Sequence, residues 1–427
     1  MLDIKLIREN SIRVRENLAK RNDKEKIKLF EELLNVDIEW RKTQTEINSL
    51  RQKRNEFSIE ISQLKKAGKS PDKQLKEAKK NDSQIEEKQV NLIQLESRER
   101  YLLLSIPNLL HESVPIGKDE NNNVEVRKWG IPPKFDFTPK NHLEILGNLG
   151  IADTERAAKV AGAGFVFLKD EAVMLDLAIQ RFAIDFLKGK GFTIVEPPLM
   201  INARAREGMV DPADFQMATY KIENEDMFLI ATSEHPMGAM FAEEILDKNN
   251  LPLKLAGISP CFRKEVGAHG KYTKGLFRMH QFNKVEQFVF CLPEKSWEIH
   301  EDLQKNSEEL YKALGLHYRV VNVCTGDIGI IAAKKYDTEV WMADGKFREV
   351  GSNSNCTDYQ ARRLNIRFRE KQGQAPIGFV HTLNNTALAT SRTMIAILEQ
   401  FQQKDGSVLM PKALQPYMDD IERLEKK

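Results

Sequence analysis

The spacing of hydrophobic residues differs between the two parts of this chain: it is typical of a coiled coil near the amino end, and helix and strand signals alternate in the rest. Between Leu33 and Leu64, side chains at alternating steps of three and four form a seam that is typical of a coiled coil. Only two members of the seam are not apolar, and we predict one long helix across the stretch. The seam consists of Leu33, Val36, Trp40, Thr43, Ile47, Leu50, Arg54, Phe57, Ile61 and Leu64.

A second helix is predicted to fold back on the first. The residues from Ala67 to Pro71 carry glycine and proline and indicate a turn. The apolar stripe beyond it ends before Pro107 and consists of Leu75, Ala78, Ile85, Leu92 and Leu103. Helices of roughly 35 residues would span roughly 50 Å. We therefore expect an antiparallel coiled-coil hairpin over about residues 26–104, which stands out as an arm.

The tip of this hairpin is basic. Residues 65–80 hold seven lysines against Asp72 and Glu77. Such a surface suits the phosphates of a nucleic acid, although a solubilising face on a coiled coil explains it equally well. The shorter amphipathic stretch before the hairpin offers packing residues for the base of the arm. These are Leu2, Leu6, Val14 and Leu18.

Beyond a polar connector at residues 111–138, helix and strand signals alternate. A helix at 175–189 leads into a strand at 192–195 and the break at Pro197. A buried strand at 228–231 then ends in the sequence Thr232-Ser233-Glu234. Hydroxyl and carboxylate groups at a strand end suit ligand binding, but the same residues could cap a helix at 237–246.

A polar hairpin between Ile258 and Phe290 carries the strongest chemical signal. Arg263 and Glu265 lie two apart on the incoming strand, and Arg278, Phe282 and Glu286 are evenly spaced on the returning strand. Even spacing places side chains on one face of a sheet. Guanidinium groups bind phosphate or carboxylate, and an aromatic ring can stack on a base. The hairpin predicts a nucleotide and amino-acid pocket, with a solvated hairpin of surface ion pairs as the alternative.

Two later segments add charged groups. A strand at 346–350 delivers Glu349 and is followed by Ser352, and these hard oxygen donors suit Mg²⁺. The stretch 378–392 runs into an amphipathic helix at 394–403 and places Arg392 at its start. A cation there opposes the helix dipole and indicates a nearby anion. A polar turn without a ligand could explain the first segment, and a surface ion pair could explain the second.

Composition favours a two-domain protein and argues against membrane proteins and proteins that bind nucleic acid over their whole surface. The chain has 427 residues, 41% of them hydrophobic, which is enough for two domains and a large core. A net charge of +2 argues against nucleic-acid binding over the whole surface. No apolar run of ~18 residues and no apolar leader is present, so we expect no membrane contact and a cytoplasmic location. The cysteines lack metal-binding spacing and are expected to be reduced. They are Cys261, Cys291, Cys324 and Cys356.

Six segments, in order along the chain, resemble those of class II aminoacyl-tRNA synthetases, and the seryl-tRNA synthetases among them. The sequences FRKE, GLFRMHQF and KVE, between residues 262 and 286, resemble motif 2. Residues 175–198 resemble motif 1 and residues 378–392 resemble motif 3. The Thr232-Ser233-Glu234 loop, the Glu349 segment and the arm complete the set. The resemblance implies an α+β fold, with a helical tRNA-binding arm at 1–108 and a catalytic domain of antiparallel sheet flanked by helices at 109–427.

The resemblance also implies the roles of individual residues. Arg263 and Arg392 would be catalytic, with Arg263 on the α-phosphate and the substrate carboxylate. Glu349 and Ser352 would hold Mg²⁺. Residues implied to contact ATP are Arg263, Lys264, Glu265, Arg278, Met279, Phe282, Glu349, Val350, Gly351, Ser352 and Arg392. Those implied to contact serine are Thr232, Ser233, Glu234, Arg263, Glu286, Asn384 and Thr386.

The implied activity is a serine–tRNA ligase that forms seryl-adenylate from ATP and transfers serine to tRNA(Ser); charging of tRNA(Sec) stays open. The resemblance further implies a homodimer in which each arm reaches the tRNA served by the other subunit. No zinc is expected, although a rarer, zinc-dependent type of seryl enzyme exists. A ligase that loads a carrier protein would fit the same pocket, and an inert interaction protein could keep the same fold. This chain differs from the family pattern at Lys169-Asp170-Glu171, and at His269 and Tyr272 in the motif 2 loop.

Overall fold

The computed structural model describes residues 1–211, 219–265 and 275–426. It divides into two compact units, one formed by Leu2–Pro107 and the other by Asn108 onward together with Met1. Each unit is described by itself.

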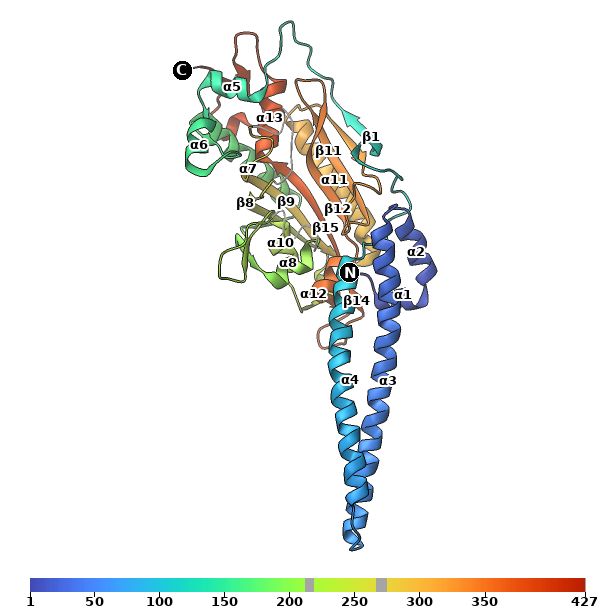
Figure 1. The fold of residues 1–427 in the computed structure, drawn as a ribbon. Coiled ribbons are helices and arrows are strands. Elements are labelled where there is room, and N and C mark those ends of the chain that lie inside the picture. Colours follow the sequence, from blue (N-terminus) through green and yellow to red (C-terminus); the bar gives the residue numbers. More distant parts are fainter. Residues whose placement is uncertain (212–218, 266–274, 427) are drawn as a thin grey trace. The chain divides into compact units, whose positions relative to one another are not determined.

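The amino-terminal unit is helical. Two short helices, α1 (Ile4–Glu9) and α2 (Ser11–Ala19), precede the long helices α3 (Lys24–Lys66) and α4 (Asp72–Ser105). Helices α3 and α4 lie side by side and run in opposite directions (Figure 1). The 43 residues of α3 correspond to about 65 Å at 1.5 Å per residue. The predicted coiled-coil hairpin is therefore confirmed.

The seam between α3 and α4 differs from the predicted pattern at several positions, one of which is the exposed Arg54. Leu75 was expected on the apolar stripe of α4, but 45% of its surface is exposed, because it lies next to the solvated turn. Asn81 is buried in its place, and its amide donates a 3.0 Å hydrogen bond to the carbonyl of Leu50. A polar residue that satisfies a backbone carbonyl thus occupies a seam position that hydrophobic periodicity does not detect.

An eight-stranded sheet forms the centre of the second unit. Its strand order is β1-β10-β11-β12-β15-β9-β8-β4, and all neighbours are antiparallel except β4 and β8 (Figure 1). The strands are β1 (Val124–Trp129), β4 (Thr193–Val195), β8 (Leu253–Phe262), β9 (Gln281–Cys291), β10 (Tyr318–Asn322), β11 (Lys334–Trp341), β12 (Phe347–Asn355) and β15 (His381–Ala389).

Three helices pack on this sheet and complete the core. They are α7 (Glu171–Gly189), α11 (Ser296–Ala313) and α13 (Thr390–Gln400). Their apolar faces meet the buried side of the central strands, as at Leu175, Leu303 and Ile395. The arrangement is the predicted mainly antiparallel sheet flanked by helices.

Smaller elements surround the core. The remaining helices are α5 (His142–Leu149), α6 (Thr154–Ala161), α8 (Ala203–Met209), α10 (Glu234–Ala239) and α12 (Tyr359–Leu364). The remaining strands are β2 (Ala152–Asp153), β3 (Phe167–Leu168), β5 (Met200–Asn202), β6 (Met227–Leu229), β7 (Ile245–Asp247), β13 (Arg367–Arg369), β14 (Gly378–Phe379), β16 (Val408–Leu409) and β17 (Arg423–Leu424). Short 3-10 helices lie at Glu120–Asn122, Lys248–Asn250, Pro293–Lys295 and Gln415–Tyr417.

Several predicted elements differ in detail. The connector at 111–138 contains the edge strand β1, in which Val124, Val126 and Trp129 occur among charged residues. The helix predicted at 237–246 is instead α10 followed by β7. In the Lys169-Asp170-Glu171 departure, Asp170 has a φ of +46°, a backbone conformation that glycine adopts most easily. Among the described residues, no helix is long and apolar enough to cross a membrane.

Candidate active site

A cavity lies beside the β8–β9 hairpin and contains most of the predicted ATP residues. It encloses about 420 Å³ of space, part of it open to solvent. Strands β9, β12 and β15 and the start of α13 contribute the walls. The lining residues are Arg263, Glu265, Phe277, Met279, Phe282, Lys284, Glu349, Val350, Gly351, Thr386, Ala389, Ser391 and Arg392.

Strand register explains why distant residues meet here. Phe282, Lys284 and Glu286 alternate along β9 and share one face. Glu286 is paired directly with Thr386 on β15, and β15 in turn pairs with β12. The order of central strands thus joins three segments that are far apart in the sequence into one wall.

Arg263 occupies the point where β8 ends. The strand stops at Phe262, so Arg263 and Glu265 do not share a pleat as expected; Glu265 has a φ of +47°. The Nε of Arg263 donates to the carbonyl of Ala231 at 3.3 Å, and its Cζ lies 5.2 Å from the centroid of the Phe282 ring. These contacts leave the Arg263 guanidinium beside the ring expected to hold adenine.

Two further arginines lie at the outer end of the cavity. Arg392 lies in the first turn of α13, which begins at Thr390 rather than at 394; it donates to the carbonyl of Glu349 at 2.8 Å, and its Cζ lies 4.8 Å from the centroid of the Phe277 ring. Arg278 precedes β9 rather than lying on it, and donates to Glu265 at 3.3 Å. Arg278, Arg392 and Glu349 also line a large open groove next to the cavity.

Glu234 provides the first of two carboxylates among the residues expected to contact serine. Its Oε1 accepts from Gln360 at 3.2 Å and from Asn384 at 3.0 Å, both through neutral amides. Burial, aided by the nearby Glu286 carboxylate, raises the pKa of Glu234 to about 7. The backbone N–H of Glu234 donates to the hydroxyl of Thr232 at 3.2 Å, whereas Ser233, the N-cap residue of α10, makes no side-chain capping hydrogen bond.

Glu286 provides the second carboxylate, and it is held differently. It is buried, and its Oε2 lies 2.7 Å from the ammonium of Lys284, which is also buried. The hydroxyl of Thr386 donates to the same oxygen at 3.1 Å. Among the residues that the structure describes, no hydrogen bond reaches the other oxygen, Oε1.

The two predicted metal ligands, Glu349 and Ser352, lie close to the carboxylate of Asp337. The hydroxyl of Ser352 lies 2.6 Å from Asp337 and 3.2 Å from Glu349. Burial raises the pKa of Asp337 to about 7, although Lys335 opposes it. Burial acts in the same direction on Glu349, but the Arg392 and Lys335 charges outweigh it and hold the pKa of Glu349 below its usual value.

Not every predicted residue faces the cavity. The ammonium of Lys264 lies 5.9 Å from the centroid of the Tyr220 ring, and Lys264 is absent from the lining. Ser233 is buried and donates to the carbonyl of Gly257 at 3.3 Å. His269 and Tyr272 lie outside the described residues.

Sequence reasoning missed several residues in or next to the cavity, among them Phe277, Lys284, Asp337 and Gln360. Lys284 has the same even spacing as Phe282 and Glu286, so the strand pattern could have revealed it. Asp337 faces Ser352 across two strands that are adjacent in space, and only the register shows that.

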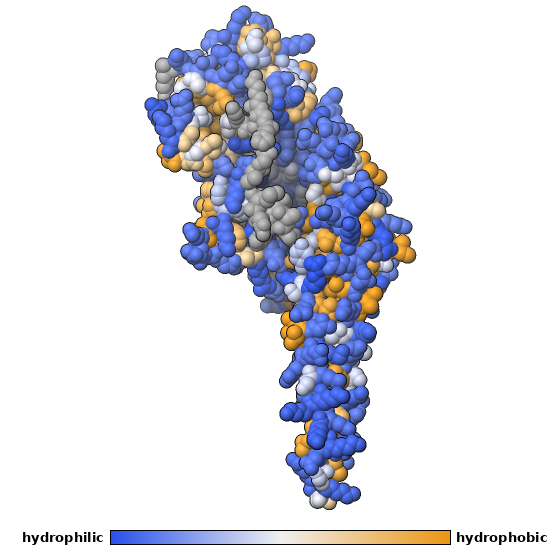
Figure 2. All heavy atoms as spheres, in the orientation of Figure 1, coloured by the Kyte–Doolittle hydropathy of each residue, from blue (hydrophilic) through white to orange (hydrophobic). Residues whose placement is uncertain are grey.

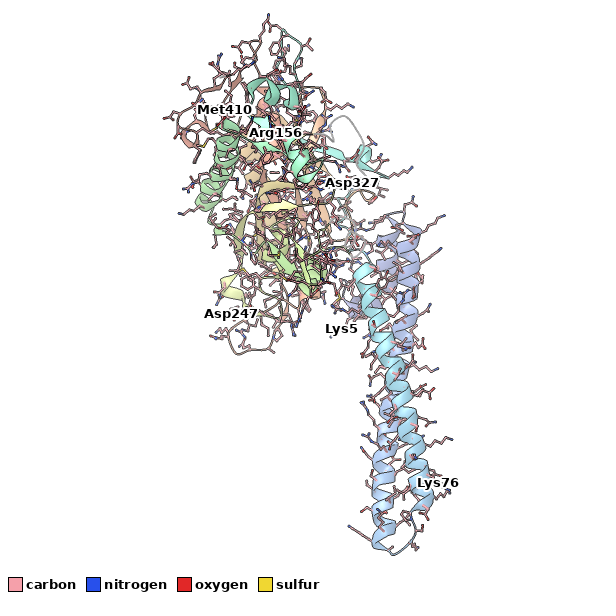
Figure 3. The ribbon with its side chains drawn as sticks, turned by 60° about the vertical axis from the view of Figure 1, so that its left-hand side comes forward. Lys5, Lys76, Arg156, Asp247, Asp327 and Met410 are labelled. Atoms are coloured by element: carbon pink, nitrogen blue, oxygen red, sulfur yellow. The ribbon has the colours of Figure 1, made fainter. Side chains whose placement is uncertain are left out.

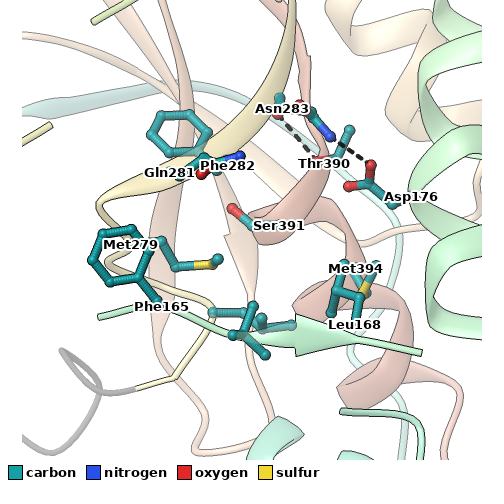
Figure 4. A pocket seen from close by; sticks show the side chains of 12 residues that line it. Phe165, Leu168, Asp176, Met279, Gln281, Phe282, Asn283, Thr390, Ser391 and Met394 are labelled. Carbon is teal, nitrogen blue, oxygen red and sulfur yellow. Dashed lines mark hydrogen bonds between the residues drawn. The ribbon is translucent and has the colours of Figure 1, made fainter. Parts of the chain in front are cut away.

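A second cavity shares Met279, Phe282 and Ser391 with the first. Figure 4 shows its apolar wall, with Phe165, Leu168 and Met394, and a polar end where Asn283 donates to Asp176 at 2.7 Å. Asp176 belongs to α7, so this cavity connects the motif 1 helix with the ring expected to stack on adenine.

Two protein-family models match separate parts of this chain. Residues 1–110 match the seryl-tRNA synthetase N-terminal domain, and residues 218–401 match the class II tRNA synthetase core domain (G, H, P, S and T). The chain is 54% identical over 425 residues to a serine–tRNA ligase of Methanocella arvoryzae, covering 99% of this chain and all of the relative.

Solved structures agree. A crystal structure of seryl-tRNA synthetase from Pyrococcus horikoshii complexed with ATP is 49% identical, covers both chains in full and superposes with a TM-score of 0.95. A cytoplasmic serine–tRNA ligase from Naegleria fowleri in complex with AMP is 34% identical, with a TM-score of 0.89; the match covers 100% of this chain and 99% of that one.

Proposed function

Since this chain belongs to the seryl-tRNA synthetase family and is a serine–tRNA ligase, we propose that it activates serine in the cavity beside the β8–β9 hairpin. The observation that carries the proposal is the convergence of Arg263, Phe282, Glu349 and Arg392 on one cavity, next to Glu286. Relatives of known structure bind ATP or AMP, and adenine stacking on Phe282 fits this arrangement.

Serine lies at the inner end, between the two carboxylates. Glu234 receives the ammonium and Glu286 the side-chain hydroxyl, with Thr386 fixing the orientation of Glu286. Thr232 and Asn384 position Glu234. Alanine would leave the Glu286 oxygen without a partner, and a site built to bond a hydroxyl can reject the analogue lacking it by ~10⁴-fold.

Activation needs alignment more than side-chain chemistry. The serine carboxylate attacks the α-phosphorus of ATP, the bond to the bridging oxygen breaks, and pyrophosphate leaves. Arg263 contacts the α-phosphate and the carboxylate, while Arg278 and Arg392 contact the outer phosphates. Fixed positive charge at the place where negative charge develops lowers the barrier. The terminal ribose hydroxyl of the tRNA then attacks the seryl carbonyl, and AMP leaves.

The oxygen donors next to the cavity fit Mg²⁺. Glu349 and Ser352 offer hard oxygen ligands within 3.2 Å of each other, and Asp337 accepts from Ser352. Bound there, Mg²⁺ would neutralise phosphate charge. Among residues 1–211, 219–265 and 275–426, no cluster of three His, Cys, Asp or Glu side chains suited to a metal is present. Independence from zinc remains a prediction that metal analysis of the purified protein tests.

The arm, assigned to residues 1–108, binds tRNA(Ser), and residues 109–427 carry catalysis. In support, the arm matches the family's N-terminal domain, and all seven lysines of the tip are exposed. The protein is a homodimer through the motif 1 region, where Val173, Met174 and Leu177 on α7 are exposed to solvent. We place it in the cytoplasm, as expected from the sequence.

Amino-acid-dependent exchange of pyrophosphate into ATP tests the proposed site. Serine should support exchange, whereas threonine, alanine and cysteine should not. Arg263→Ala should lower the exchange by at least ~10²-fold, since it removes the contact to the reacting phosphate. Lys264→Ala, the neighbour that faces away from the cavity, is the matched control and should keep most activity. Equal losses in both variants would contradict the assignment.

A further inference from the structure

Lys284 is a buried charge that neither family resemblance nor the proposed mechanism uses. It lies between Phe282 and Glu286 on the face of β9 that lines the cavity. Its ammonium is 2.7 Å from Glu286 Oε2, and the side chains are 8% and 1% exposed, respectively. An ion pair so far from solvent interacts strongly, because water screens it little.

This ion pair makes the two carboxylates of the site unequal. Glu286 has a full positive charge against one oxygen, whereas Glu234 accepts hydrogen bonds from the neutral amides of Gln360 and Asn384 and is affected by the Lys284 and Arg263 charges from farther away. A second cation next to Glu286 would meet the Lys284 ammonium as a like charge, which is costly in a buried site. A neutral hydroxyl would meet no such penalty and could donate to the oxygen that Lys284 leaves open.

We propose that Lys284 is a specificity-determining residue, which reserves Glu286 for a neutral hydroxyl donor and directs the substrate's ammonium to Glu234. Lys284 thereby fixes the orientation of serine and excludes amino acids with a cationic side chain of similar size. The inference rests on the proposed serine site.

L-2,3-Diaminopropionate tests this directly, because an amino group replaces the serine hydroxyl in an otherwise similar shape. The readout is the ratio of kcat/KM for serine to kcat/KM for the analogue, measured by pyrophosphate exchange at one pH. In Lys284→Met, Glu286 is uncompensated and attracts the cation, so the ratio should fall by about tenfold or more, the size of one charge-assisted hydrogen bond. An unchanged ratio in a folded variant would overturn the inference.

Three further variants sharpen the result. Lys284→Arg keeps the charge and should keep the wild-type ratio. Lys284→Met combined with Glu286→Gln removes both charges, and the serine-to-analogue ratio should no longer fall as it does in Lys284→Met alone. Lys335→Met removes another lysine near the site, paired at 3.7 Å with Asp337, and should leave the ratio unchanged. If Lys284→Met does not fold, Lys284→Gln gives the same test, since it keeps a donor without the charge.

Failure of the proposed serine site can be distinguished from failure of the proposed role of Lys284. If Glu286→Gln left the discrimination of serine from alanine unchanged, the serine site itself would be wrong. If Glu286→Gln relaxed that discrimination but Lys284→Met did not alter the serine-to-analogue ratio, only the role of Lys284 would be refuted.

Discussion

At the scale of single residues, burial gives Glu234 unusual protonation behaviour. The pKa of this carboxyl is raised to about 7, first by burial and then by the Glu286 carboxylate. A raised pKa means that the group is neutral below about pH 7 and charged above it. Only the charged form pairs with an ammonium, so recognition of serine should depend on pH in the neutral range.

We therefore expect kcat/KM for serine, measured by pyrophosphate exchange, to rise with pH about a midpoint near 7. In Glu234→Gln the activity should be lower and this rise should disappear. The comparison matters because Asp337, whose pKa is also raised to about 7, titrates in the same range. If the same rise persisted in Glu234→Gln, Glu234 would not be its source.

The sequence located most residues that line the cavity but not their contacts. Phe282 and Glu286 followed from strand alternation, and Arg392 from its conflict with the helix dipole. The positions predicted for Arg278 and Glu265 were wrong because β8 ends before Glu265 and β9 begins after Arg278, and residues outside a strand do not follow its period. Asp337 could not be predicted from the sequence, because its partner, Ser352, lies on another strand.

At the scale of elements, the hairpin of α3 and α4 has its hydrophobic contacts along the seam between the helices and its charged side chains on the outer surface. Its buried positions lie along the seam, while Figure 2 shows a mostly hydrophilic surface along its length. Figure 3 shows Lys76 near the tip, where the seven lysines from Lys65 to Lys80 surround the turn. The tip thus offers a concentration of positive charge, with Leu75 as an exposed apolar side chain among the lysines, and this charge suits the backbone of a nucleic acid.

Replacing these seven lysines with glutamine should weaken aminoacylation of tRNA(Ser) by about 10-fold or more in kcat/KM and reduce its dependence on salt. Pyrophosphate exchange, which needs no tRNA, should stay near wild type. Replacement with arginine, which keeps the charge, is the matched control and should preserve charging. Equal losses of charging and exchange would argue against a tRNA-binding role for the tip.

Periodicity predicted the hairpin well, since a heptad seam has few alternative structures. It was less successful for β1 and for the region around α10, where elements of six residues or fewer carry too little pattern. Short elements of this kind are fixed by their neighbours in the sheet or core rather than by their own sequence.

At the scale of the whole molecule, an exposed apolar surface on α7 supports the proposed subunit interface. Leu177 is 54% exposed, and Val173 and Met174 are exposed beside it on a helix whose other face is in the core. Apolar groups gathered on one helix face are typical of a contact with another chain. Strand periodicity and composition do not reveal such a surface, because it depends on which face the core leaves open.

Leu177→Asp should shift the protein from dimer to monomer at micromolar concentration, because it places a charge in an apolar interface. Sedimentation velocity or light scattering measures the shift. Ile59→Asp is the matched control, since Ile59 is an exposed apolar residue on the arm, and it should leave the dimer intact. A monomeric wild-type protein would contradict the proposed interface.

A crystal structure with a non-hydrolysable seryl-adenylate analogue tests the central claim most directly. We predict adenine on the Phe282 ring, Arg263 at the group that replaces the α-phosphate, the seryl hydroxyl at Glu286 and the ammonium at Glu234. An analogue bound elsewhere, or bound in this cavity without contacts to Arg263 and Glu286, would contradict the account.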